Sequence, residues 1–108
     1  MRSIVTKYTD ISAFSGAPAE CRHHLCFGVG KREIAEQEGL WIPLTNSEHN
    51  MSSNGLIYQI HSNPAAEKLS KMCGQLAFEK EFYRKKCIDG NDDPAREVFR
   101  KMMGESYL

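Results

Sequence analysis

The chain has 108 residues, of which 41% are hydrophobic, and its 14 Lys and Arg residues balance 14 Asp and Glu residues. This length allows one domain that buries roughly two-thirds of its unfolded surface, and the zero net charge argues against a protein that coats DNA through a global positive field. The four cysteines follow no CxxC pattern, no stretch resembles a signal peptide, and no apolar run approaches the roughly 20 residues that cross a bilayer. We therefore expect a single cytoplasmic domain, residues 1–108, with reduced thiols and no membrane contact.

Residues 1–19 are predicted to form an arm that leads into a tight turn. Residues 4–8, Ile-Val-Thr-Lys-Tyr, favour extended structure, and small and turn-forming residues follow them. Residues 20–27 are then long enough for one strand, which Gly28 ends. The adjacent His23 and His24 lie on this strand or at its edge.

Residues 31–37 have helical composition and are closed by Gly39, after which the apolar residues 40–44 predict a second strand. Pro43 favours an edge position, because proline cannot donate a hydrogen bond to a sheet. The two strands are expected to form a hairpin with a helical insertion.

A capping box follows the second strand. In Thr45-Asn46-Ser47-Glu48 the side chains of the first and last residues can each bond the other's backbone amide, which predicts a short helix beginning just before His49. Residues 56–61 are a candidate for a short extended segment. Asn63-Pro64 then resembles a helix N-cap followed by proline at the first helical position.

Two C-terminal helices are expected within residues 63–108. Apolar side chains at spacings of three, four or seven predict a stripe of the first helix that faces the core; its members are Leu69, Met72, Cys73, Leu76 and Tyr83. A polar break at residues 87–92 precedes Asp93-Pro94, which restarts a helix. Val98, Phe99, Met102 and Met103 repeat the same spacing there.

The histidines carry the candidate chemistry. Adjacent residues of a strand point to opposite faces, so His23 and His24 are expected to have distinct roles. In isolation, such a pair is better explained by one packed and one solvated imidazole than by a catalytic pair. His49, about 25 residues later and early in a helix, changes the interpretation, because two strands and a helix that bring histidines together form a ββα-metal layout.

The sequence resembles the phage-type HNH endonucleases, whose members carry a CxxC-Gly turn, a His-His-hydrophobic-Phe-Gly stretch, and a Gly-Leu-x-x-Pro-Leu segment before a histidine-bearing helix. The matching blocks are residues 19–28 (Ala-Glu-Cys-Arg-His-His-Leu-Cys-Phe-Gly), 39–44 (Gly-Leu-Trp-Ile-Pro-Leu) and 49–52 (His-Asn-Met-Ser), and the likeness continues through His61 to the tail, residues 99–108. The resemblance implies an α+β fold: a ββα-metal core (HNH or His-Me finger) over residues 20–62, with additional C-terminal helices over 63–108.

The resemblance also implies roles. His24 would be the general base that deprotonates the attacking water, and His23 and His49 would bind a divalent metal. His61 would supply a third imidazole or contact the scissile phosphate. Imidazole nitrogens suit Zn, Ni or Mn better than Mg. The alternative for His49 is a partly exposed histidine of the helix. For His61, a structural role explains the residue as well as the functional role does.

The chain departs from the family at the structural zinc site. Many relatives hold zinc with the CxxC turn and two further ligands near the helix start, where this chain carries Ser12, Ser15, Thr45 and Glu48. Because neutral hydroxyls are poor zinc ligands, no structural zinc is expected. We expect the capping box and the C-terminal helices to fix the helix start instead. A site rebuilt from Cys21 and Cys26 is disfavoured, because a separation of five places them on opposite faces of one strand.

The asparagine that orients the base in relatives has no match near Gly39, which leaves Asn46, Asn50 or a backbone carbonyl for that task. For DNA contact, the cations beside the expected site are Arg22, Lys31 and Arg32, which solvated surface positions explain equally well.

Three functions remain open from the sequence. The first is a metal-dependent DNA endonuclease that acts on backbone phosphates, encoded by a phage or prophage and located in the cytoplasm of the bacterial host. The second is a binding protein that kept the fold and lost catalysis, acting on a host or phage protein or on DNA in recombination or evasion of host defence. The third is an unrelated small domain with a structural histidine cluster.

Overall fold

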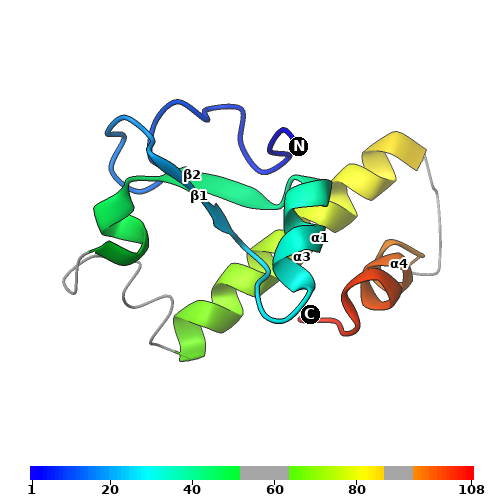
Figure 1. Ribbon diagram of the computed structural model, residues 1–108. Coiled ribbons are helices and arrows are strands. Elements are labelled where there is room, and N and C mark those ends of the chain that lie inside the picture. The colour runs from blue at the N-terminus through cyan, green and yellow to red at the C-terminus, as the bar shows by residue number, and fades with distance from the viewer. Residues whose placement is uncertain (52–63, 87–93) are drawn as a thin grey trace.

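A computed structural model describes residues 1–51, 64–86 and 94–108, and residues 52–63 and 87–93 lie outside the described part of the chain (Figure 1). The elements in chain order are β1 (Cys21–His24), α1 (Lys31–Glu38), β2 (Trp41–Leu44), the short helix η1 (Ser47–Met51), α3 (Pro64–Lys86) and α4 (Pro94–Met103). The described elements are helices with a two-stranded antiparallel sheet, which is the expected α+β class. The extended segment expected at 56–61 lies outside the described residues.

The sheet is a hairpin with α1 inserted between its strands, as expected. Strands β1 and β2 pair antiparallel, with His23 opposite Ile42 and His24 opposite Trp41. The first strand is shorter than residues 20–27, because β1 ends at His24, although the amide of Leu25 still donates to the carbonyl of Leu40 at 2.9 Å. Helix α1 ends as predicted at Gly39, which has a φ of 74°.

The N-terminal arm differs from the expectation of extended structure. Residues 4–8 form no strand. The arm instead crosses the chain where β2 begins and is held there by hydrogen bonds. The hydroxyl of Ser3 donates to the carbonyl of Trp41 at 2.7 Å, and the amide of Ile4 donates to the carbonyl of Gly39 at 2.9 Å. A Cβ atom at Gly39 would lie 2.3 Å from the carbonyl oxygen of Arg2, so only glycine allows this close approach.

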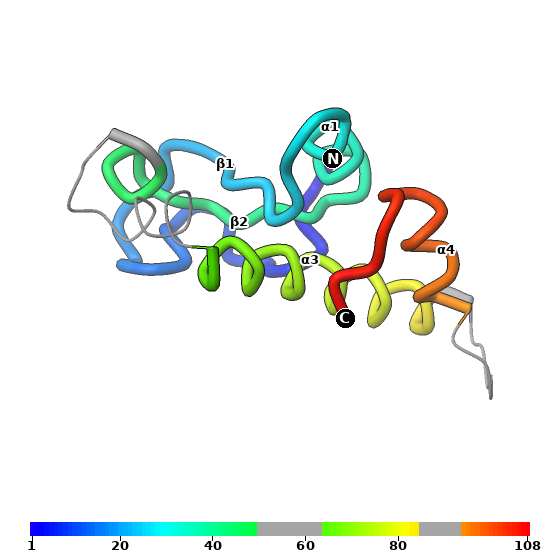
Figure 2. The backbone as a smooth tube through the Cα atoms, turned by 90° about the horizontal axis from the view of Figure 1, so that it is seen from below, coloured from blue at the N-terminus to red at the C-terminus, as the bar shows by residue number. Residues whose placement is uncertain are grey.

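The C-terminal helices build the core. Helix α3 runs along one side of the hairpin and α1, and α4 packs against α3 and α1 (Figures 1 and 2). The fully buried ring of Phe99 lies 5.5 Å from that of Phe78 and 5.9 Å from that of Tyr107. Burying one such side chain contributes about 1.5–3 kcal/mol. Within residues 1–51, 64–86 and 94–108, no helix has the length and hydropathy required to cross a membrane.

The predicted core stripe of α3 is wrong. Leu69 and Leu76 are 59% and 53% exposed, and Cys73 is also exposed. The side of α3 turned inward instead carries Ser70, Gly74, Gln75, Phe78 and Glu79. Small and hydrogen-bonding residues are buried there because α3 lies so close to the segment after β1 that a Cβ atom at Gly74 would stand 2.8 Å from the sulfur of Cys26. On α4 the prediction is better, since Phe99 and Met103 are buried while Val98 is 39% exposed.

Candidate active site

The two adjacent histidines contact different helices. His23 is 1% exposed and faces α3, whereas the side chain of His24 is 12% exposed and faces α1. This arrangement follows from the alternation of side chains along a strand, and it gives the two imidazoles different partners.

His24 forms a hydrogen bond with Glu36 of α1. The Nε2 atom of His24 lies 2.9 Å from Oε1 of Glu36, while the other carboxylate oxygen accepts from Arg22 at 2.6 Å and from the amine of Met1 at 3.2 Å. Because a carboxylate only accepts, the shared hydrogen belongs to Nε2 of His24, and in the neutral ring Nδ1 is then the proton acceptor. The His24 bond is the main cause that lowers the pKa of Glu36; burial opposes the shift, and the amine and Arg22 add to it.

The partner of His24 was missed from the sequence, which offered Asn46, Asn50 or a backbone carbonyl. Glu36 stands 12 positions after His24 in a helix that also carries Glu33 and Glu38. Nothing in the sequence distinguishes the glutamate that turns towards β1 from the other two.

His23 is held by a hydrogen-bond chain from α3. Its Nε2 atom lies 3.1 Å from the hydroxyl of Ser70, and that hydroxyl is 2.9 Å from the carbonyl oxygen of Leu25. A serine hydroxyl has one hydrogen, and the Leu25 carbonyl can only accept it. The hydrogen between His23 and Ser70 therefore belongs to Nε2 of His23, so the neutral ring carries its lone pair on Nδ1.

His49 of η1 stands beside His23. The two ring centres are 5.4 Å apart, with an angle of 63° between the ring planes. Two imidazoles whose nitrogens bind one tetrahedral metal at 2.0–2.1 Å have ring centres about 5 Å apart, and an edge-to-face ring contact has the same spacing. His61 lies outside the described residues. Within the described residues, no group of three or more His, Cys, Asp or Glu side chains is placed to hold a metal.

The capping box is confirmed, and it is part of a larger cluster. The amide of Thr45 donates to the carboxylate of Glu48 at 2.9 Å, and the amide of Glu48 donates to the hydroxyl of Thr45 at 3.2 Å. The hydroxyl of Ser12 donates to the same carboxylate oxygen at 2.5 Å, and it accepts from the amide of Ser15 at 3.2 Å. Burial raises the pKa of Glu48, but the hydrogen bonds from Ser12, Ser15 and Thr45 outweigh burial and lower it to about 2.

Two of the three cations expected to contact DNA make intramolecular ion pairs. Arg22 bonds Glu36 and stacks 4.0 Å above the ring of Trp41. Lys31 pairs with Glu105, and this hydrogen bond is the main cause that raises the pKa of Lys31. Arg32 is exposed on α1.

No family model, curated protein or solved structure matches the chain.

Proposed function

We propose that this protein is a metal-dependent DNA endonuclease of the HNH type, with His24 as the general base. The observation that carries the proposal is the bond between His24 and Glu36, because it holds the hydrogen on Nε2 and makes Nδ1 the acceptor of a proton. The resemblance of the sequence to HNH enzymes supplies the reaction class.

His24 is proposed to make the first of the two proton transfers of phosphodiester hydrolysis. Nδ1 of His24 takes a proton from the attacking water as the water oxygen bonds to phosphorus, and the bond from phosphorus to the leaving sugar oxygen breaks. The leaving oxygen takes up a proton from solvent. The ionised carboxylate of Glu36 faces the imidazolium that forms and stabilises its charge. A general base of this kind contributes about 10²- to 10⁴-fold to the rate.

His23 and His49 are the residues that would hold the divalent ion, with Mn, Ni or Zn preferred over Mg for imidazole ligands. When bound, the ion supplies positive charge that stabilises the phosphorane and the leaving oxygen. Ser70 orients His23 through Nε2, as hydrogen-bond partners of metal-binding histidines do. His61 is proposed as a further ligand or phosphate contact.

The cluster around Glu48 supports the resemblance. Ser12, Ser15, Thr45 and Glu48 stand at the positions that carry the zinc ligands of relatives, and the folded chain brings these four residues together. Hydrogen bonds among them satisfy the backbone amides of Thr45 and Glu48 at the start of η1, and fixing the helix start is the role proposed for the capping box.

The test is nicking of a supercoiled plasmid with Mg, Mn, Ni and Zn, comparing the wild type with His24→Ala and with Gln37→Ala, an exposed change on α1. We expect His24→Ala to lower the rate at least about 100-fold and Gln37→Ala to leave it unchanged. Equal cleavage by wild type and His24→Ala would exclude the role of His24.

A binding protein that keeps the fold without catalysis, acting on DNA or on a phage or host protein, is the second candidate. Three observations favour it: His23 is 1% exposed, His23 and His24 contact different helices, and Arg22 and Lys31 are engaged within the chain. Absence of cleavage with every metal would favour this candidate over the endonuclease.

A further inference from the structure

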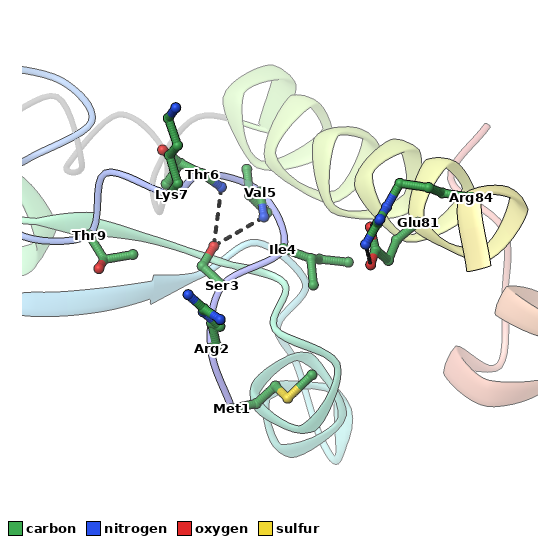
Figure 3. A pocket seen from close by; sticks show the side chains of 10 residues that line it. All are labelled: Met1, Arg2, Ser3, Ile4, Val5, Thr6, Lys7, Thr9, Glu81 and Arg84. Atoms are coloured by element: carbon green, nitrogen blue, oxygen red, sulfur yellow. Dashed lines mark hydrogen bonds and ion pairs between the residues drawn. The ribbon is translucent and has the colours of Figure 1, made fainter.

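A cavity of about 590 Å³ lies between the N-terminal arm and the last turns of α3. Figure 3 shows the arm on one side of it and Glu81 and Arg84 of α3 on the other. Three cationic side chains line the cavity, Arg2, Lys7 and Arg84, against the single carboxylate of Glu81. The lining is therefore positive, although the chain as a whole has no net charge.

The charge of Glu81 is already balanced within the cavity. Arg84 reaches both of its carboxylate oxygens, at 2.6 and 3.0 Å. Among the residues that the structure describes, no carboxylate lies within ion-pair distance of Arg2 or Lys7. The positive charge of the lining is thus concentrated on the arm.

An aromatic ring, which is not itself part of the cavity lining, stands next to Lys7. The ring of Tyr8 is 63% exposed, and the Nζ atom of Lys7 lies 5.1 Å from its centre. Proteins that bind nucleic-acid strands combine cations that follow the backbone with exposed aromatic rings on which bases stack. A free phosphate ion has no base that could stack on such a ring.

The arm is fixed beside the proposed base. The amine of Met1 lies 3.2 Å from the carboxylate of Glu36, which is the partner of His24, and the carbonyl of Met1 accepts from the indole of Trp41 at 2.9 Å. Since Met1 also lines the cavity, the cavity and the His24–Glu36 pair share a wall.

We infer that this cavity binds phosphate groups of a nucleic-acid strand, with Arg2 and Lys7 as the principal contacts. The inference rests on the proposed function, because it places the strand flanking the cleaved bond along the N-terminal arm. Arg2 and Lys7 would then make the main phosphate contacts in place of Arg22 and Lys31, whose charges are engaged within the chain.

The experiment is fluorescence anisotropy of a labelled DNA strand and of the matching duplex, in EDTA and at several NaCl concentrations, with the full chain. In the double variant Arg2→Ala/Lys7→Ala, we expect binding at 100 mM NaCl to weaken about 10-fold and the slope of log K against log salt to become shallower by about 1 to 2. Lys101→Ala, an exposed lysine of α4, should bind as the wild type does. The double variant Arg2→Lys/Lys7→Arg should retain the salt dependence.

Unchanged DNA affinity in Arg2→Ala/Lys7→Ala would overturn the inference. Inorganic phosphate that displaces DNA well beyond the effect of equal ionic strength would also overturn it, because the ligand would then be the free ion. Since EDTA removes divalent ions, the assay reports on the cavity whether or not the protein cleaves DNA. Loss of plasmid nicking alone therefore counts against the proposed function and not against the cavity.

Discussion

The Nε2 atom of His24 and the Oε1 atom of Glu36 lie 2.9 Å apart and join β1 to α1. This bond determines which nitrogen of His24 can accept a proton. It also depends on the charge of Glu36, whose pKa the His24 bond keeps below its ordinary value.

Glu36→Gln keeps the size of the side chain and removes its charge, so the imidazolium formed during catalysis loses its stabilising partner. We expect plasmid nicking to slow about 10- to 100-fold, which is typical when an orienting hydrogen-bond partner is altered. Glu33→Gln, a change at an exposed glutamate of the same helix, is the matched control. If the two variants cleave equally, Glu36 has no special role.

Ser70→Ala is expected to release His23 from its fixed tautomer, because the buried Nε2–H loses its acceptor. Long-range ¹H–¹⁵N spectra of the metal-free protein should show the Nε2–H form of His23 in the wild type and a mixture in the variant. The unsatisfied donor should also lower the free energy of unfolding by about 1–3 kcal/mol. A wild-type His23 spectrum in Ser70→Ala would contradict the assignment.

The free energy of unfolding should depend on pH through the ionisation of Glu48. The pKa of this carboxyl falls to about 2 in the folded chain, below its ordinary value, so the ionised form stabilises the fold above about pH 4.5. This contribution is lost as the pH falls towards 2. Glu48→Gln can keep the capping geometry but does not titrate.

Urea unfolding of the wild type and Glu48→Gln at pH values from 7 to 2 measures this effect. The wild type should be more stable at pH 7, and the difference should shrink between about pH 4.5 and 2. A constant difference over this range would show that Glu48 does not carry the effect.

Gly74→Ala tests the close approach of α3 to the segment after β1. Alanine in the middle of a helix normally stabilises by about 1 kcal/mol relative to glycine, but here its Cβ would stand 2.8 Å from the sulfur of Cys26 and 3.1 Å from Cβ of Leu25. We expect a net loss of about 1–3 kcal/mol in the free energy of unfolding. Adding Cys26→Ala should recover part of the loss in a double-mutant cycle; a stabilised Gly74→Ala would show that the helix can shift.

Local signals in the sequence predicted much of the fold. The hairpin, the end of α1 at Gly39 and the capping box at Thr45 and Glu48 depend on residues that are close in the sequence or on backbone geometry, and the structure confirms each of them. His23 and His49, which the sequence analysis paired as metal ligands, have ring centres 5.4 Å apart.

The inward face of α3 could not be predicted from periodicity. A stripe that includes Leu69 and Leu76 gives the better apolar pattern, yet these residues are exposed. The buried positions are polar or small because their partners come from distant parts of the chain: Ser70 meets His23, and Gln75 bonds Ser106 and the amide of Tyr107. Such partners are visible only once the tertiary structure is known.

The central claim is that His23 and His49 together bind a divalent ion, and calorimetric titration of the metal-free protein with Zn²⁺ and Mn²⁺ tests it most directly. We predict one ion per chain in the wild type, affinity lowered at least about 100-fold in His49→Ala, and nearly unchanged affinity in His24→Ala, which serves as the control. Wild-type affinity in His49→Ala, or no binding of either ion to the wild type, would contradict the account.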